Sequence, residues 1–238
     1  MTAARTLSAL GRLQSVVLDL IYPPRCVGCQ RSGTFLCDAC VASLTAASRP
    51  RCSRCWRPHP TTDPCFECWS SPPAYDGLRS AFVYEGTART LVHTLKYRQA
   101  TVLGEPMASL LVETARRDVP EADVAIPVPL SGRRRRERGY NQAEVLARAL
   151  GRALDLPVWP RALARERHTP PQARSSDADA RRRNVLGAFA CREGAVAGRR
   201  VLLVDDVTTT GATIDACAHA LRRGGARSVW ALTFARED

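Results

Sequence analysis

The stretch Val201–Thr213, with the sequence VLLVDDVTTTGAT, decides the fold of this 238-residue chain. Its apolar run Val201–Val204 is typical of a strand that is buried on both faces of a parallel sheet. Two carboxylates, Asp205 and Asp206, follow at the carboxyl end of that strand, which is where open α/β sheets bind their ligands. We therefore expect the chemistry of the protein at this end of the sheet.

The hydroxyl-rich turn after the acidic pair is suited to an anion. Backbone N–H groups at such a turn and at the helix that follows bind phosphate, and Gly211 permits a close approach. Carboxylates and a phosphate site fit a single ligand when that ligand is a sugar phosphate, because sugar hydroxyls need acceptors while the phosphate needs donors. The acidic pair supplies the acceptors, and the turn that directly follows it supplies the donors.

Other proteins with acidic strand ends do not fit the sequence. A P-loop NTPase needs G-x-x-x-x-G-K-[ST], but Lys96, the single lysine, is followed by Tyr97. A receiver domain would need most of its fold after the acidic pair, whereas 32 residues follow Asp206. The G-x-G-x-x-G dinucleotide fingerprint is absent. A purely structural strand and turn is the remaining alternative.

Apolar strands alternate with amphipathic helices through the rest of the second part of the chain. This alternation predicts an α/β fold, a mostly parallel sheet with flanking helices. Strands are expected within 79–86, 122–130, 200–207 and 228–235, and helices over 87–97, 103–116, 141–153 and 213–226.

Eight of the ten cysteines form four Cys-x-x-Cys pairs. Two pairs supply the thiolates of one tetrahedral zinc site, so four pairs predict two structural zinc ions. Disulfides are the alternative, but a reducing compartment favours metal. Sequential and crossed pairing both satisfy the ligand count; the short gaps favour sequential pairing without deciding it. The predicted ligands are Cys26, Cys29, Cys37, Cys40, Cys52, Cys55, Cys65 and Cys68.

The cysteine-rich part is expected to be a separate module. Residues 1–72 hold few large apolar side chains, so metal binding should supply much of their folding free energy. The segment Ser70–Ala74, SSPPA, is typical of a linker because paired prolines interrupt helices and strands. We expect an N-terminal helix and double zinc ribbon over 1–72, and the α/β domain over 75–238.

The N-terminus does not have the pattern of a secretory signal. Arg12, Gln14 and Asp19 interrupt its apolar residues, whose spacing over 7–21 instead predicts an amphipathic helix. The sequence has no run of about 18 apolar residues, so no membrane span is expected. These patterns predict a cytoplasmic protein.

The formal net charge of +12 is concentrated in one region. Residues 131–183 contain 14 arginines and 6 acidic residues, a net charge of +8. Such a segment suits a phosphate-rich ligand, either a sugar diphosphate or a nucleic-acid backbone. A solvated surface is the alternative.

Val201–Thr213 closely resembles the 5-phosphoribosyl-1-diphosphate (PRPP) motif of type I phosphoribosyltransferases. A wider resemblance, to the ComF family, rests on the cysteine pairs, on LVHTLKYRQ at 91–99, on IPVPLSGRRRRERGYNQAEVLA at 126–147 and on RRRNVLGAF at 181–189. This resemblance implies a zinc-binding N-terminus joined to a phosphoribosyltransferase-like domain. It also implies a link to natural transformation, in which imported single-stranded DNA is handled.

The resemblance assigns residues to a PRPP site. It implies that Asp205 and Asp206 hold the ribose hydroxyls and that the turn binds the 5'-phosphate through Thr208, Thr209, Thr210, Gly211, Ala212 and Thr213. The diphosphate, carrying Mg2+, is expected near Lys96, Pro129, Leu130, Ser131 and Arg138. A hood over the site would include Thr169, Gln172 and Asn184.

The sequence and its resemblance to the ComF family leave three alternative functions. The first is a ComF-type protein that binds PRPP and single-stranded DNA, with a DNA-uptake helicase or another competence protein as a partner. The second is an active phosphoribosyltransferase, for which the sequence identifies no acceptor base or amine. The third is a zinc-ribbon adaptor whose second domain keeps the fold without the ligand.

Overall fold

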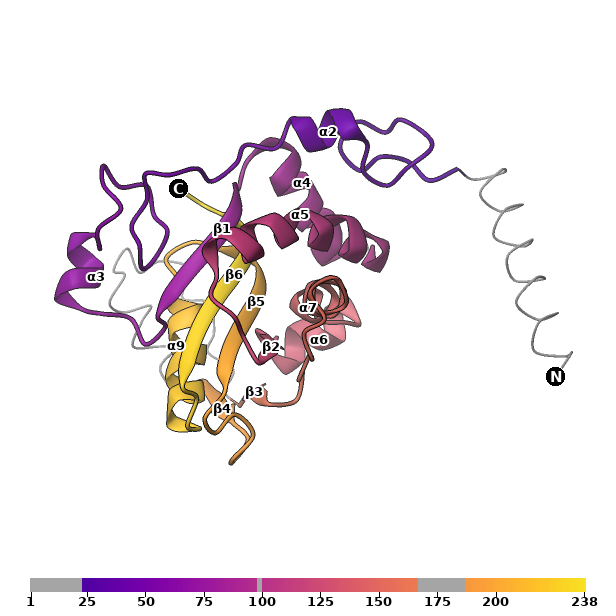
Figure 1. Ribbon diagram of the computed structural model, residues 1–238. Helices are drawn as coiled ribbons and strands as arrows, with labels where there is room; N and C mark the ends of the chain where they lie inside the picture. Colours follow the sequence, from indigo (N-terminus) through magenta and orange to yellow (C-terminus); the bar gives the residue numbers. More distant parts are fainter. Residues whose placement is uncertain (1–22, 98–99, 167–186) are drawn as a thin grey trace, which may run out of the picture.

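The computed structural model describes residues 23–97, 100–166 and 187–238 (Figure 1). Its centre is a four-stranded parallel sheet in the order β1–β6–β5–β2. The predicted α/β fold with a parallel sheet is confirmed, and β5, the strand of the acidic pair, lies in the interior of the sheet. The strands are β1 (Gly77–Val83), β2 (Val124–Pro127), β5 (Arg200–Thr208) and β6 (Ser228–Arg236).

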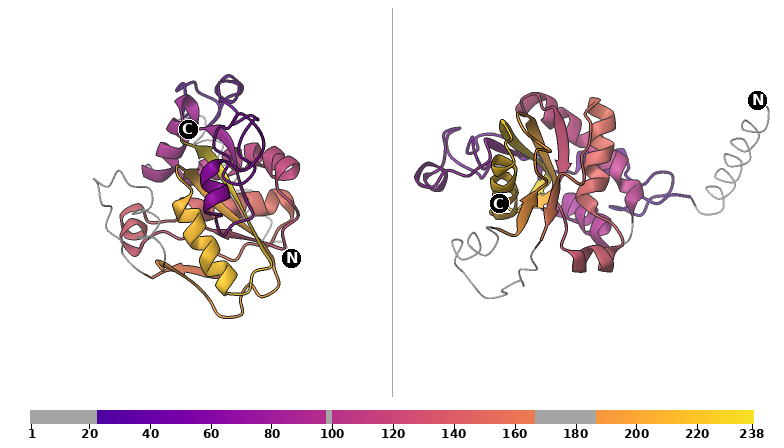
Figure 2. Two further views of the ribbon diagram at one scale, coloured as in Figure 1. Left: turned by 90° about the vertical axis from the view of Figure 1, so that its left-hand side faces the viewer. Right: turned by 90° about the horizontal axis from the view of Figure 1, so that it is seen from below.

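Helices cover both faces of the sheet (Figure 2). Val201 and Leu203 of β5 belong to the core beneath α9, whereas Leu202 and Val204 belong to the core beneath the other helices. Alternate side chains of a strand point to opposite faces, so the apolar run is buried on both sides, as its composition predicts. The helices are α9 (Ala212–Arg223) on one face and α4 (Gly86–Tyr97), α5 (Gly104–Asp118) and α7 (Gln142–Leu154) on the other.

Some elements were not predicted. Helix α6 (Gly132–Arg138) follows β2 where a loop was expected, and it buries none of its residues. It therefore lacks the apolar periodicity by which a helix is found in sequence. A short antiparallel pair, β3 (Leu163–Arg165) and β4 (Phe189–Cys191), and a 3-10 turn, η1 (Thr101–Leu103), complete the described elements of this part.

The second half of the ribbon module packs on the edge of the sheet. Ala47 N donates to Ala81 O at 2.9 Å, and Leu78 N donates to Arg54 O at 2.7 Å, so ribbon backbone pairs with β1. Trp56 is buried, and its Nε1 donates to Ser80 O at 3.1 Å. The ribbons themselves carry two short helices, α2 (Asp38–Ala42) and α3 (Phe66–Ser70).

The carboxyl end of the chain contacts the same ribbon. Arg236, which is buried, donates from Nη1 to Cys55 O at 2.7 Å, and Arg51 pairs with Asp238 at 2.5 Å. The boundary expected between 72 and 75 stays a prediction, but the ribbon and the α/β part share a packed interface.

Several expectations concern residues that the structure does not describe. The N-terminal helix over 7–21 and the hood residues Thr169, Gln172 and Asn184 lie outside the described residues. Within 23–97, 100–166 and 187–238, no helix is long and apolar enough to cross a membrane.

Candidate functional site

The acidic pair ends β5, but its two side chains diverge. Asp205 continues the face of Leu203, under α9, and Asp206 continues the face of Val204, under α4. Each carboxylate also accepts a hydrogen bond from the next backbone N–H, Asp205 from Asp206 N and Asp206 from Val207 N, both at 2.9 Å. The two carboxylates therefore offer acceptors on both sides of the strand end.

Asp206 is buried against the single lysine. Its Oδ2 lies 3.0 Å from Lys96 Nζ, which comes from the last turn of α4. The side chains are 3% and 16% exposed, so the pair is largely removed from water. No hydrogen bond to Asp206 Oδ2 is found among the described residues, and the Lys96 ammonium is its charge partner. Lys96, expected beside a diphosphate, is thus placed at the acidic pair.

Burial changes the pKa of Asp205, the other carboxyl of the pair. Removal from water raises the pKa of Asp205 well above its usual range, and the neighbouring charge of Asp206 raises it further. Asp205 in turn lies near Cys217 of α9, whose thiol pKa is raised by burial and then by that carboxylate. Lys96 thus compensates the charge of the buried Asp206, whereas burial favours the neutral form of Asp205.

The turn after β5 leads directly into α9. Gly211 caps the helix with a φ of 81°, a left-handed conformation that favours glycine. A Cβ at Gly211 would lie 3.2 Å from the hydroxyl oxygen of the buried Tyr75, so the turn has little room for a larger residue. The first N–H groups of a 12-residue helix have no partners within the helix and carry the positive end of its dipole.

The loop expected to meet the diphosphate lies beside the acidic pair. Pro127 of β2 is in register with Val204 of β5, and Val128 N donates to Val204 O at 2.9 Å. The structure therefore brings Pro129, Leu130 and Ser131 to the same sheet edge as Asp205. Ser131 is buried and caps α6 by accepting from Arg134 N at 3.4 Å.

The stretch Arg138–Gln142 connects this loop to two helices. Asn141 donates from Nδ2 to Val128 O at 3.0 Å and accepts from Ala143 N at 3.1 Å, which caps α7. The Tyr140 hydroxyl donates to Leu95 O on α4. Arg138 donates to Gln142 Oε1 at 2.9 Å and lies over the ring of Tyr97, 5.0 Å from its centroid. These contacts are structural links that the sequence motif alone did not indicate.

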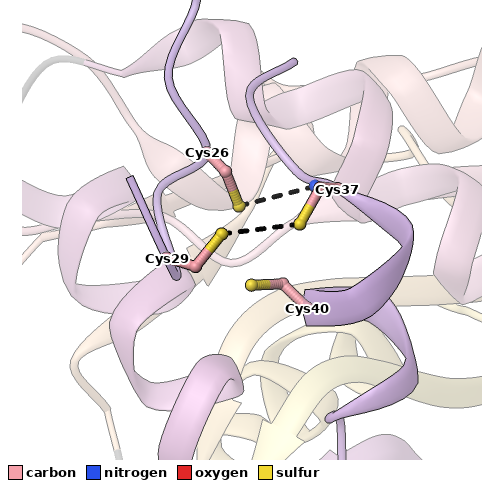
Figure 3. Close-up of side chains that lie close together, drawn as sticks. All are labelled: Cys26, Cys29, Cys37 and Cys40. Carbon is pink, nitrogen blue, oxygen red and sulfur yellow. Dashed lines mark hydrogen bonds between the residues drawn. The ribbon is translucent and has the colours of Figure 1, made fainter. Parts of the chain in front are cut away.

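The first four cysteines converge on one point, as Figure 3 shows. Cys29 and Cys37 place their Sγ atoms 3.6 Å apart, and Cys37 N donates to Cys26 Sγ at 3.4 Å. Tetrahedral Zn–S bonds of about 2.3 Å put sulfurs about 3.8 Å apart. The separation fits a zinc site and exceeds a disulfide bond.

The last four cysteines form a second cluster of the same kind. Cys55 and Cys65 place their Sγ atoms 3.8 Å apart, and Cys65 N donates to Cys52 Sγ at 3.2 Å. In each cluster the four sulfurs lie within 4.8 Å of one another. The pairing is therefore sequential, the alternative that the short gaps favour, and both donor sets suit a structural zinc ion.

Two family models match the chain. Residues 17–69 match a double zinc ribbon domain, and residues 137–237 match a phosphoribosyl transferase domain. The sheet, the two cysteine clusters and these matches define a double zinc ribbon joined to a phosphoribosyltransferase-type domain.

Relatives of similar length share both parts. The DNA utilization protein YhgH of Salmonella typhi is 34% identical over 83% of this chain and 89% of its own length. Competence protein F of Haemophilus influenzae is 33% identical over 89% of this chain and 97% of its own. Competence protein ComFC of Bacillus subtilis is 28% identical over 84% of each. The chain belongs to the ComF family.

Proposed function

We propose that this protein binds PRPP at the carboxyl ends of β5 and β2. The observation that carries the proposal is the acidic strand end followed by a left-handed glycine and the N-terminus of α9. Ribose hydroxyls would donate to Asp205 and Asp206, and the 5'-phosphate would accept from N–H groups and hydroxyls of residues 208–213. The loop at 129–131 and Arg138 would face the diphosphate.

Mg2+ would arrive with the diphosphate. This ion usually keeps several waters and takes one or two carboxylates together with phosphate oxygens. Among the described residues, Asp206 Oδ2 is a buried oxygen without a hydrogen bond, but Lys96 already compensates its charge. That arrangement favours an ion held mainly by the ligand over one held by the protein alone.

We further propose that the protein acts in DNA utilization or uptake in the cytoplasm and binds single-stranded DNA. The names of its relatives support the process, and exposed arginines of α6 support contact with a phosphate backbone. A DNA-uptake helicase or another competence protein would be its partner. The cellular process, DNA binding and the protein partner are proposals that go beyond what the fold alone implies.

Thermal unfolding with and without PRPP and Mg2+ tests the ligand. A ligand that binds only the folded state must raise the melting temperature, with saturation as its concentration increases. Ribose 5-phosphate and inorganic diphosphate serve as partial ligands and should give smaller shifts. No shift with millimolar PRPP would support the adaptor, whereas release of diphosphate in the presence of a base or amine would identify a transferase.

A further inference from the structure

A groove of about 550 Å³ is lined by the first zinc ribbon on one side and by helix α4 on the other. Arg25 and the partly exposed Phe35 line it from the ribbon, and Arg89 and His93 line it from α4. Among the described residues that line it, none has an acidic side chain. The groove thus combines cationic and apolar groups, which is the composition that a nucleotide chain needs.

The charges of the groove are available to a ligand. Within the described residues, neither Arg25 nor Arg89 forms an ion pair. A zinc ion on four thiolates carries a net charge of about −2. Because Arg25 directly precedes the first ligand, Cys26, the negative metal site partly offsets the positive charge of Arg25. Arg89 lies on the opposite wall and is exposed. The positive potential of the groove is therefore expected to be strongest along α4.

Helix α4 presents a stripe of three exposed side chains toward this region. Arg89, His93 and Tyr97 follow one another at four-residue spacing, which places them on one helix face. The ring centroids of His93 and Tyr97 are 4.7 Å apart, and Tyr97 is 63% exposed. At a rise of 1.5 Å per residue, the stripe is about 12 Å long.

The stripe ends next to the candidate PRPP site. Tyr97 follows Lys96, which contacts Asp206, and the guanidinium of Arg138 lies over the Tyr97 ring. Arg138 is the last residue of α6, whose arginines 134–136 are exposed. A continuous path of cations and aromatic rings therefore runs from the first ribbon along α4 to α6.

We propose that single-stranded DNA lies along this path, with its phosphates on Arg25 and Arg89 and its bases stacked on His93 and Tyr97. The inference rests on the DNA part of the proposed function and names the surface that would perform it. Proteins that bind single strands without sequence preference combine backbone cations with aromatic stacking platforms in this way. The strand would pass beside the acidic pair, so DNA and PRPP would occupy neighbouring sites.

Fluorescence anisotropy with a labelled oligo(dT) tests the path on the full, zinc-loaded chain. The first variant, Arg25→Ala with Arg89→Ala, should weaken binding and reduce the salt slope by about 1.4, since each phosphate contact contributes about 0.7. The second, His93→Ala with Tyr97→Leu, should weaken binding at least about fivefold with little change in slope, because stacking is not ionic.

The matched control is Arg223→Ala with Arg227→Ala. It removes the same charge from exposed positions at the end of α9 and just beyond it, on the opposite face of the sheet. It should retain the wild-type salt slope. Inorganic polyphosphate, which has charge but no bases, should displace oligo(dT) less effectively from the wild type than unlabelled oligo(dT) does.

The outcomes separate the inference from the proposed function. If the wild type binds oligo(dT) and both groove variants behave like the control, the inference is wrong while DNA binding stands. If the wild type fails to bind at about 50 mM salt, the DNA part of the proposed function fails as well. The melting temperature without ligand verifies that each variant is folded, and the PRPP-induced thermal shift tests the sugar-diphosphate site separately.

Discussion

Lys96 Nζ lies 3.0 Å from Asp206 Oδ2, and the pair joins the last turn of α4 to the end of β5. Apart from Lys96 and the histidines, every basic residue of the chain is an arginine. An ammonium is a compact point charge, whereas guanidinium is a planar fork that needs more space. The buried position of the pair gives a physical reason for a lysine here, and the same contact couples the stability of the fold to the candidate ligand site.

Lys96→Met is expected to lower the free energy of unfolding by about 1–3 kcal/mol, because it leaves Asp206 buried without its charge partner. Asp206→Asn should recover part of that loss in the double variant. Denaturant unfolding of the wild type, the two single variants and the double variant measures the coupling. Strictly additive losses would show that the pair does not interact energetically. Lys96→Arg is the control that keeps the charge and changes the shape.

The fold was predictable because its main strands carry strong local signals. The apolar run before Asp205 and the glycine at 211 gave both the sheet and the position of the candidate site. The contact between Lys96 and Asp206 was not predictable, because it depends on how α4 packs over β5, and 110 positions separate the two residues. Helix α6 was missed because its arginines bury nothing, so it is defined by the Ser131 cap and the left-handed Gly139 rather than by apolar spacing.

Asp205→Asn is expected to stabilise the folded protein at neutral pH while weakening PRPP binding. The pKa of Asp205 is raised in the folded state by burial, so its contribution to stability is fully present at acidic pH and is lost as pH rises through the folded-state pKa. Asparagine does not ionise and avoids that loss. The stability gain over the wild type should therefore be larger at pH 8 than at pH 5.

Urea unfolding at the two pH values, with zinc present throughout, measures this difference. Calorimetry with PRPP and Mg2+ on the same variant measures the expected loss of affinity, and Asp205→Asn with Asp206→Asn should abolish binding. A variant that is less stable than the wild type at both pH values would contradict the proposed desolvation of Asp205. Unchanged PRPP affinity in the double variant would place the ligand elsewhere.

Loss of one zinc site should destabilise the α/β part of the protein more than loss of the other. Cys26 and Cys52 are equally inaccessible, so Cys26→Ser and Cys52→Ser form a matched pair. The second site packs on β1 and on Arg236 through its backbone, so we expect Cys52→Ser to lower the melting temperature of the α/β part more than Cys26→Ser does. Elemental analysis should find two zinc ions in the wild type and one in each variant.

Hydrogen exchange identifies which segments lose protection in each variant. Loss of protection in β1 and β6 for Cys52→Ser alone would support the shared interface. Equal effects of the two substitutions on the sheet would show that the second ribbon supports it no more than the first does. A zinc content of one or none in wild-type protein that has not met a chelator would contradict the two-site assignment.

Asn141 should control the loop at the candidate diphosphate site through its two side-chain hydrogen bonds. Asn141→Ala removes both the cap of α7 and the donor to Val128 O, so we expect a loss of about 1–2 kcal/mol in stability together with weaker PRPP binding. Asn141→Asp keeps an acceptor for Ala143 N but has no amide to donate to Val128 O. It should therefore retain most of the helix stability and still bind PRPP less tightly. Urea unfolding and calorimetry on the two variants separate these effects, and an Asp variant with wild-type affinity would show that the contact to Val128 does not position the loop for its ligand.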